Sequence, residues 1–203
     1  MKYLLVVLFF CIIGSNLIAQ ENKTAAPATK NLQFHSINQA GLLEGESGSA
    51  FQLQTINGLG YRSWFTGIGV GLDYYRLRSI PLFLDLRKEF GRSAGRFFVY
   101  AEGGIDFAWA TDKQKNDYLD YPYYQSNNFQ NGPYAAAGIG YKLIFTRNLA
   151  LVISPGFSYK KKELKSSNTS NTYCPVNGPP CVASEDRYDY NFYRFSLNLG
   201  LVF

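Results

Sequence analysis

The sequence predicts an all-β fold, an eight-stranded antiparallel up-and-down transmembrane β-barrel. Three observations predict it. Apolar residues recur at every second position through most of the chain, the alternating segments are longer than ordinary soluble strands, and the residues between the apolar ones are small or charged. A period of two is typical of strands, because successive side chains point to opposite faces of a sheet.

Eight alternating segments can be counted between clusters of Gly, Asn, Ser and Pro. Each has 10 to 15 residues, which is long enough for a tilted strand to cross a bilayer. The segments are residues 34–44, 51–60, 65–75, 80–90, 96–109, 134–145, 149–160 and 189–203.

The two faces of these segments differ in size, and this difference indicates where lipid lies. In residues 67–75 the even positions include Ile68, Val70 and Leu72, whereas glycines occupy most odd positions. A soluble lipocalin-like barrel or sandwich, the main alternative, would place the bulky residues inside. Glycine-rich faces are too small to form an outer surface, but they fit the narrow interior of an eight-stranded barrel. The bulky face is therefore expected to meet lipid.

Aromatic residues at the segment ends predict two girdles at the membrane surfaces. Strand propensity alone also enriches Tyr and Phe, which is the simpler explanation. The girdle residues are Tyr61, Trp64, Phe65, Phe90, Phe97, Phe145 and Phe203 on the inner rim, and Tyr74, Tyr75, Trp109, Tyr134, Tyr159 and Tyr193 on the outer rim.

The last eleven residues, YRFSLNLGLVF, alternate and end on Phe203. In this they resemble the closing strand of bacterial outer-membrane barrels. With eight strands, the mature chain is similar to the small barrels typified by the transmembrane domain of outer membrane protein A, and to porin-like barrels. The resemblance implies a bacterial outer-membrane location and an assembly machinery that reads a C-terminal signal, here Phe203 with Leu201 and Leu199. It rests on pattern rather than on a long motif, so it implies architecture more than activity.

Three regions are expected along the chain. Residues 1–19 predict a secretory signal peptide, with Lys2, an apolar run from Leu4 to Ile13 and a cleavage site after Ala19. An uncleaved membrane helix is the alternative, but ten residues span only about 15 Å of a hydrocarbon core about 30 Å thick. Residues 20–33 predict a flexible periplasmic tail, and residues 34–203 predict the barrel.

The links between the segments differ in length. Those at residues 110–133 and 161–188 are long, and the others are short. Outer-membrane barrels have short periplasmic turns and longer extracellular loops. Both termini are therefore expected on the periplasmic side, with the long links at the cell surface.

The composition offers few residues for catalysis or metal binding. The chain has 16 Tyr and 16 Phe but one His and one Met, so haem or zinc would find almost no ligands. Its formal net charge is +5, and basic residues are mixed with acidic ones rather than gathered in one segment. We therefore expect no cofactor, no metal and no nucleic-acid partner.

Charged residues on the small faces predict a polar network inside the barrel. Because an isolated buried ion is costly, these charges must be paired or hydrated. We expect salt bridges that plug the lumen, with a narrow porin-like passive pore as the alternative, although eight strands normally leave no open channel. The network residues are Asp73, Asp85, Arg87, Glu102, Asp106, Lys142 and Arg194.

A membrane-embedded lipid-modifying enzyme is the third possibility, and it needs a base close to a nucleophile. Only His35 beside Ser36 offers such a pair. They stand at the start of the first strand, near the inner rim, whereas the lipid substrates of such enzymes lie in the outer leaflet. No catalytic residue is assigned.

The long links predict contacts outside the membrane. Tyr mixed with Asn and Ser is typical of adaptable surfaces for proteins or glycans, and clustered lysines are suited to the anionic headgroups of lipopolysaccharide. The simpler interpretation is that both links are solvated loops. The contact candidates are Tyr118, Tyr121, Tyr123, Tyr124, Lys160, Lys161 and Lys162. The expected partners are thus outer-membrane lipid and lipopolysaccharide, the assembly machinery, and an extracellular protein or glycan.

Two cysteines, Cys174 and Cys181, remain after the signal peptide is removed. An exported chain meets an oxidising compartment, and the residues between them have loop composition. We expect a disulfide that closes this small loop and stabilises it by roughly 2–3 kcal/mol.

Overall fold

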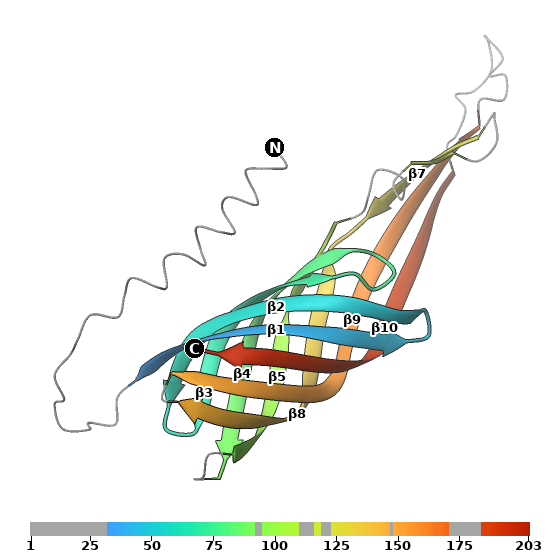
Figure 1. Ribbon diagram of the computed structural model, residues 1–203. Coiled ribbons are helices and arrows are strands. Elements are labelled where there is room, and N and C mark those ends of the chain that lie inside the picture. The colour runs from blue at the N-terminus through green and yellow to red at the C-terminus, as the bar shows by residue number, and fades with distance from the viewer. Residues whose placement is uncertain (1–31, 92–94, 110–115, 119–122, 147, 171–183) are drawn as a thin grey trace, which may run out of the picture. The chain divides into compact units, whose positions relative to one another are not determined.

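The computed structural model describes residues 32–91, 95–109, 116–118, 123–146, 148–170 and 184–203, which include a closed barrel of antiparallel strands (Figure 1). Within these ranges, no helix is long and apolar enough to cross a membrane. The expected signal peptide, nearly all of the expected tail and the Cys174–Cys181 loop lie outside the described residues.

Eight strands form the barrel: β1 (Gln33–Gly45), β2 (Gly48–Tyr61), β3 (Trp64–Asp73), β4 (Ser79–Phe90), β5 (Gly95–Ala108), β8 (Gly132–Thr146), β9 (Leu149–Ser170) and β10 (Ser184–Val202). Two shorter strands, β6 (Asn116–Tyr118) and β7 (Tyr123–Phe129), come between β5 and β8 in the chain. Each predicted segment coincides largely with one barrel strand, and several strands extend beyond the predicted ends. β1 begins at Gln33, so it includes the last residue of the expected tail.

Consecutive barrel strands pair with each other, and β10 pairs with β1 to close the ring. The strands are staggered, because a path of paired residues that leaves β1 at His35 returns to β1 ten residues further on, at Gly45. Such a stagger requires the strands to tilt relative to the barrel axis. The path runs through His35, Gly58, Gly67, Asp85, Glu102, Ala136, Ser158, Arg194 and Gly45.

The bulky faces of the strands point outward. In β10 the side chains of Leu197 and Leu199 are 45% and 54% exposed, whereas Ser196 and Asn198 are 2% and 3% exposed. A soluble barrel requires the reverse arrangement, because its exterior must be polar. The exterior of this barrel is suited to hydrocarbon.

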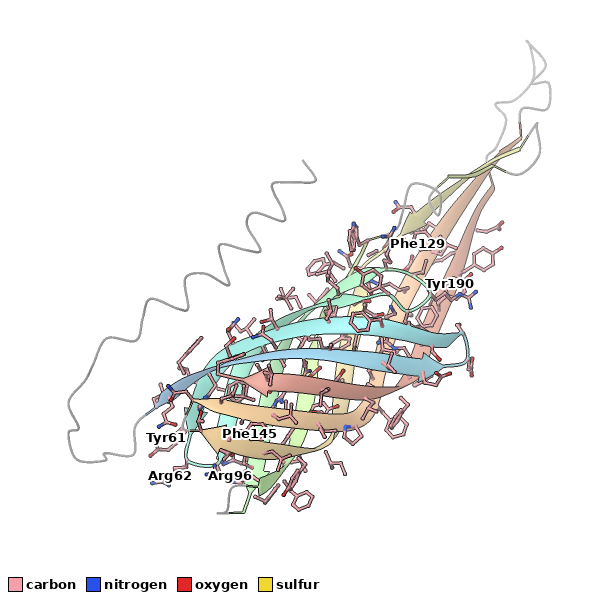
Figure 2. All side chains as sticks on the ribbon, in the orientation of Figure 1. Tyr61, Arg62, Arg96, Phe129, Phe145 and Tyr190 are labelled. Atoms are coloured by element: carbon pink, nitrogen blue, oxygen red, sulfur yellow. The ribbon has the colours of Figure 1, made fainter. Side chains whose placement is uncertain are left out.

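The two ends of the barrel can be distinguished by the start of β1 and by Phe203. At one end, here called the terminal rim, Ser36 and Phe203 exchange backbone hydrogen bonds of 3.0 and 2.9 Å. The β2–β3, β4–β5 and β8–β9 connections lie at this rim, together with Tyr61, Arg62 and Phe145 (Figure 2). The opposite end, here called the loop rim, carries the β1–β2, β3–β4 and β9–β10 connections and the chain between β5 and β8.

A narrow sheet projects from the loop rim (Figure 1). It consists of the distal parts of β9 and β10, which pair as far as Asn168 and Ser184, with β7 paired to β9 and β6 paired to β7. The expectation that residues 110–133 and 161–188 are loops is therefore wrong for a large part of both ranges. These strands lie beyond the closed ring, so no buried face imposes an apolar period on their sequence.

The aromatic girdles are present with fewer members than expected. Phe65, Tyr75 and Tyr134 are 6%, 2% and 4% exposed and face the interior, so their assignment to the girdles is wrong. Tyr159 is half-buried on the outer surface. The remaining expected girdle residues are exposed: Tyr61, Trp64, Phe90, Phe97, Phe145 and Phe203 at the terminal rim, and Tyr74, Trp109 and Tyr193 at the loop rim.

Candidate functional site

The barrel interior holds equal numbers of buried acidic and basic side chains among the described residues. Equal numbers matter because a buried charge without a partner costs several kcal/mol. The four acids are Asp73, Asp85, Glu102 and Asp106, and the four bases are Arg87, Lys160, Lys162 and Arg194. Six of the seven residues expected from the sequence are in this set, and the seventh, Lys142, lies at the terminal rim.

The largest group of interior charges, here called the Asp73 cluster, consists of Asp73, Lys160 and Arg194 near the loop rim. The Asp73 carboxylate accepts hydrogen bonds from Arg194 Nη1 and, at 3.1 Å, from Lys160 Nζ. Asp73 ends β3, whereas the two cations belong to β9 and β10. The cluster therefore joins distant parts of the barrel wall across the mouth.

Lys160 also fastens the connection between β3 and β4. Its Nζ donates to the carbonyl oxygens of Tyr75 and Leu77, both at 3.2 Å, and to Ser79 Oγ at 3.1 Å. The next inward residue of β9, Lys162, lies 2.9 Å from Asp106 Oδ2 and donates to the Asp106 carbonyl at 2.7 Å.

The expected role of Lys160 and Lys162 as outer contacts for lipopolysaccharide is therefore wrong, because both side chains are 0% exposed. Strand β9 continues past residue 160, and alternation turns both lysines toward the lumen. Lys161 between them faces outward and pairs with Asp189 at 2.9 Å. This hydrogen bond raises the pKa of Lys161 and lowers the pKa of the Asp189 carboxyl.

A chain of hydrogen bonds crosses the middle of the lumen. The Gln39 side chain donates to Gln54, Gln54 Nε2 donates to Tyr134 Oη at 3.3 Å, and Tyr134 Oη donates to Glu102 Oε2 at 2.9 Å. These four residues belong to β1, β2, β8 and β5. The chain therefore spans the barrel and gives the Glu102 carboxylate a donor.

The interior toward the terminal rim is mostly apolar. Asp85 and Arg87 of β4 form a bidentate pair with N–O distances of 2.9 to 3.1 Å, and the guanidinium lies over the Phe98 and Tyr100 rings. Around this pair is an apolar floor of buried side chains from five strands. The residues of the apolar floor are Ile37, Phe65, Phe98, Val152 and Val202.

Lys142 belongs to a small ionic group at the terminal rim. Its Nζ lies 2.7 Å from Glu89 Oε1, and Arg96 Nη1 lies 2.9 Å from Glu89 Oε2. The side chains of Lys142, Glu89 and Arg96 are 15%, 17% and 33% exposed, respectively, so solvent reaches the group.

His35 and Ser36 do not form a catalytic pair. Neighbouring residues of a strand point to opposite faces. The His35 ring lies 6.4 Å from the ring of interior Phe65, so His35 faces the lumen and Ser36 faces outward. In the part of the chain that the structure describes, no group of three or more His, Cys, Asp or Glu residues could hold a metal ion.

Several interior residues were missed in the sequence. Lys160, the last residue of the predicted segment, and Lys162, two residues beyond it, share the even-numbered parity of the lumen residues Ser154 and Ser158 of β9, and this parity could have identified them. Gln39 and Gln54 also have the parity of lumen residues, but neutral amides give no charge signal. Their hydrogen bonds to each other and to Tyr134 depend on the tilt and stagger of the strands, which place β2 opposite β8.

Three of the four expected contact tyrosines belong to strands of the projecting sheet. Tyr118 is in β6, and Tyr123 and Tyr124 are in β7, where only the backbone is described. Tyr121, like Cys174 and Cys181, lies outside the described residues. The contact surface and the disulfide therefore remain predictions.

No family model matches the chain, and no curated protein matches its sequence. Among solved structures, Neisserial surface protein A (NspA) matches 85% of this chain and 97% of its own, with 12% identity and a TM-score of 0.57. The N-terminal β-barrel domain of Pseudomonas aeruginosa OprF matches 85% and 100%, with 14% identity and a TM-score of 0.46. The outer membrane protein OprG from Pseudomonas aeruginosa matches 84% and 95%, with 14% identity and a TM-score of 0.46.

Sequence identities this low support a conclusion about the fold alone. Of the three structures, only NspA has a TM-score above 0.5. The likeness to NspA agrees with the eight paired strands, the closed ring and the apolar exterior. The chain has the fold of the small eight-stranded bacterial outer-membrane β-barrels.

Proposed function

We propose that this chain is an integral protein of the bacterial outer membrane whose lumen is closed and whose projecting sheet is a contact surface at the cell exterior. The observation that carries the proposal is the projecting sheet itself. Strands β9 and β10, with 22 and 19 residues, are longer than the other barrel strands, and they continue as a paired sheet beyond the loop rim. NspA, the solved structure with the same fold, is called a surface protein.

The outward face of β9 and β10 supports the membrane location. Phe157 packs against Phe195 with 5.7 Å between ring centroids, and Tyr159 against Tyr193 with 5.1 Å. Further along β9 the outward residue is Lys161, paired with Asp189. This change from apolar to aromatic to charged residues is what a strand needs as it leaves a bilayer. The long strands therefore emerge from the membrane at the loop rim.

The rims also support an orientation. Short connections gather at the terminal rim, and outer-membrane barrels have such turns in the periplasm. We place both termini there and the projecting sheet outside the cell. Leu199, Leu201 and Phe203 are 54%, 41% and 53% exposed, and this outward row is the surface that we assign to the assembly machinery.

Membrane integration predicts a mobility change on a detergent gel. Unboiled protein should migrate differently from boiled protein, since the closed barrel resists detergent until it is heated. Samples refolded into lipid vesicles should show the folded band, and samples kept in urea should show the other band. Identical mobility before and after boiling would count against a barrel that folds in the membrane.

The closed lumen predicts that the purified protein conducts no ions. The Asp73 cluster occupies the lumen near the loop rim and the apolar floor lies toward the terminal rim, and this arrangement supports a closed lumen. In planar bilayers we expect no stable conductance steps, even after insertion has been verified on the gel. Steps of constant size would instead support a narrow passive pore.

The contact surface can be tested by shortening the projecting sheet. In one variant, residues 164–188 are replaced by Asn-Gly, a two-residue hairpin turn between the paired residues Glu163 and Asp189. We expect the barrel to fold, because the Asp73 cluster and the β9–β10 pairing within the membrane remain. Both forms are applied in nanodiscs to arrays of glycans and extracellular proteins. Ligands held only by the complete protein support the proposal, whereas equal binding by both forms, or no binding by either, contradicts it.

A further inference from the structure

The lipid-facing wall of the barrel contains a groove. One part of this groove is a hollow of about 280 Å³ over Ala135 and Ala137 of β8, and it is bordered by Phe157, Tyr159 and Tyr193. Phe157 and Tyr193 are 71% and 73% exposed, so their rings stand well above the alanines.

The floor of the groove lies on the outer surface, unlike the apolar floor inside the lumen, and it extends from β8 onto β5. Gly103 pairs with Ala135, and Ala101 pairs with Ala137. A Cβ built on Gly103 would meet no atom within 4 Å, so the space above it is open. Across this floor, Leu84 and Leu86 of β4 form the second wall, since they pair with Gly103 and Ala101. The groove thus has a floor two strands wide, with leucines on one side and aromatic rings on the other.

A positively charged group lies at the loop-rim end of β5, beyond the exposed side chains of Ile105 and Phe107, which follow Gly103 on the same face of the strand. Arg78 accepts a backbone hydrogen bond of 2.9 Å from Trp109, and its guanidinium lies 5.2 Å from the centroid of the Trp109 ring. No carboxylate among the described residues forms an ion pair with Arg78. A guanidinium stacked on an aromatic ring at a membrane surface is suited to bind phosphate.

The spacing between the charge and the hollow fits a lipid. Gly103 lies six residues from Trp109, which is about 20 Å along a strand. With a strand tilt of about 45°, this becomes about 14 Å of depth, close to half of the hydrocarbon core, about 15 Å, together with a sideways displacement of about 14 Å. An acyl chain that joins the two points must therefore follow the tilted strand past Ile105 and Phe107. A lipid with its phosphate at Arg78 would thus place the end of an acyl chain over Ala101 and Gly103.

We infer that the groove binds one membrane lipid with an anionic phosphate headgroup, its phosphate at Arg78 and one acyl chain in the hollow. A lipid fits better than a second copy of the chain because the charged end and the apolar end are one leaflet apart. This inference rests on the proposed membrane location, although it does not depend on the role of the projecting sheet.

The test uses the full-length protein purified in detergent with phosphatidylglycerol. Lipid that remains after washing is counted by native mass spectrometry. Gly103→Leu places a bulky side chain on the floor of the groove beside the hollow, where a Cβ meets no atom within 4 Å, and Arg78→Gln removes the charge. The controls are Ala40→Leu, a small outward residue on the opposite wall, and Arg62→Gln, an arginine over the Tyr61 ring at the terminal rim.

We expect each groove variant to lower the retained phosphatidylglycerol at least fivefold, with both controls close to the natural protein. For a diacylglycerol with the same chains, Gly103→Leu should lower retention and Arg78→Gln should not, because this probe lacks the phosphate. Unchanged retention in the groove variants, or an equal loss in the controls, overturns the inference. A dimer abolished by Gly103→Leu with lipid retention unchanged also overturns it, in favour of a second copy.

The gel mobility of every variant separates this test from the test of the proposed function. A chain that never shows the folded band contradicts the membrane barrel. A folded barrel that retains no lipid contradicts only the lipid site.

Discussion

Asp73→Asn should lower the free energy of unfolding by about 3–5 kcal/mol, the usual cost of removing one partner from a buried ionic group. The amide would leave Lys160 and Arg194 without their shared negative charge in a region where both side chains are 0–2% exposed. The measurement is urea unfolding in lipid vesicles, followed by tryptophan fluorescence and by the folded band on the gel.

Two further variants make this result specific. Asp189→Asn breaks the exposed pair with Lys161 and should leave the unfolding midpoint unchanged, because solvent screens such pairs. Arg194→Met added to Asp73→Asn should recover part of the loss, since it removes one uncompensated cation. If Asp73→Asn unfolds at the same urea concentration as the natural protein, the Asp73 cluster does not hold the mouth together.

Gly138→Ala should produce the second large effect. An added Cβ would lie 2.4 Å from the Pro155 carbonyl oxygen and 2.7 Å from the Cα of Gly156, which are backbone atoms of β9. It would also lie 2.8 Å from the Tyr100 ring. Because backbone atoms cannot rotate away, β8 and β9 must separate, and we expect at least the roughly 1–3 kcal/mol typical of an overpacked interior.

The matched control is Gly103→Ala, the same substitution on the outer face of β5. Its Cβ meets nothing within 4 Å, so it should leave the unfolding midpoint close to that of the natural protein. Both variants are compared by urea unfolding in the same vesicles. Equal stability of the two variants would show that close approach of β8 and β9 is not required.

The sequence predicted the barrel well because lipid imposes a regular pattern on it. The strands of the barrel carry apolar outward residues at most alternate positions, as β10 does with Leu197 and Leu199, and the narrow interior favours small side chains on the opposite face. Asn38 and Thr55 are outward-facing exceptions. Beyond the barrel this pattern ends. The distal part of β9 and all of β6 and β7 lie outside the closed ring, so they carry no apolar period and were expected to be loops.

The sequence predicted which charged residues face the lumen, but it did not predict which of them form ion pairs with each other. Parity placed Asp73, Asp85 and Glu102 on the lumen face, where they are found. Which cation meets which carboxylate depends on the ten-residue stagger, which brings β3 opposite β9 and β10. Lys160 was misassigned because β9 was expected to end at residue 160, and its partner, Asp73, lies 87 residues away in the chain.

The pairing of β10 with β1 has a consequence for biogenesis. Ile37 meets Val202, so the last hydrogen-bonded seam joins segments that are separated by almost the entire described chain. Until β10 has been synthesised, the nascent sheet has two open edges, which a bilayer does not tolerate. Insertion and ring closure must therefore occur together once β10 is available, and a chain cut short by one strand should stay outside the lipid rather than enter it as a partial sheet.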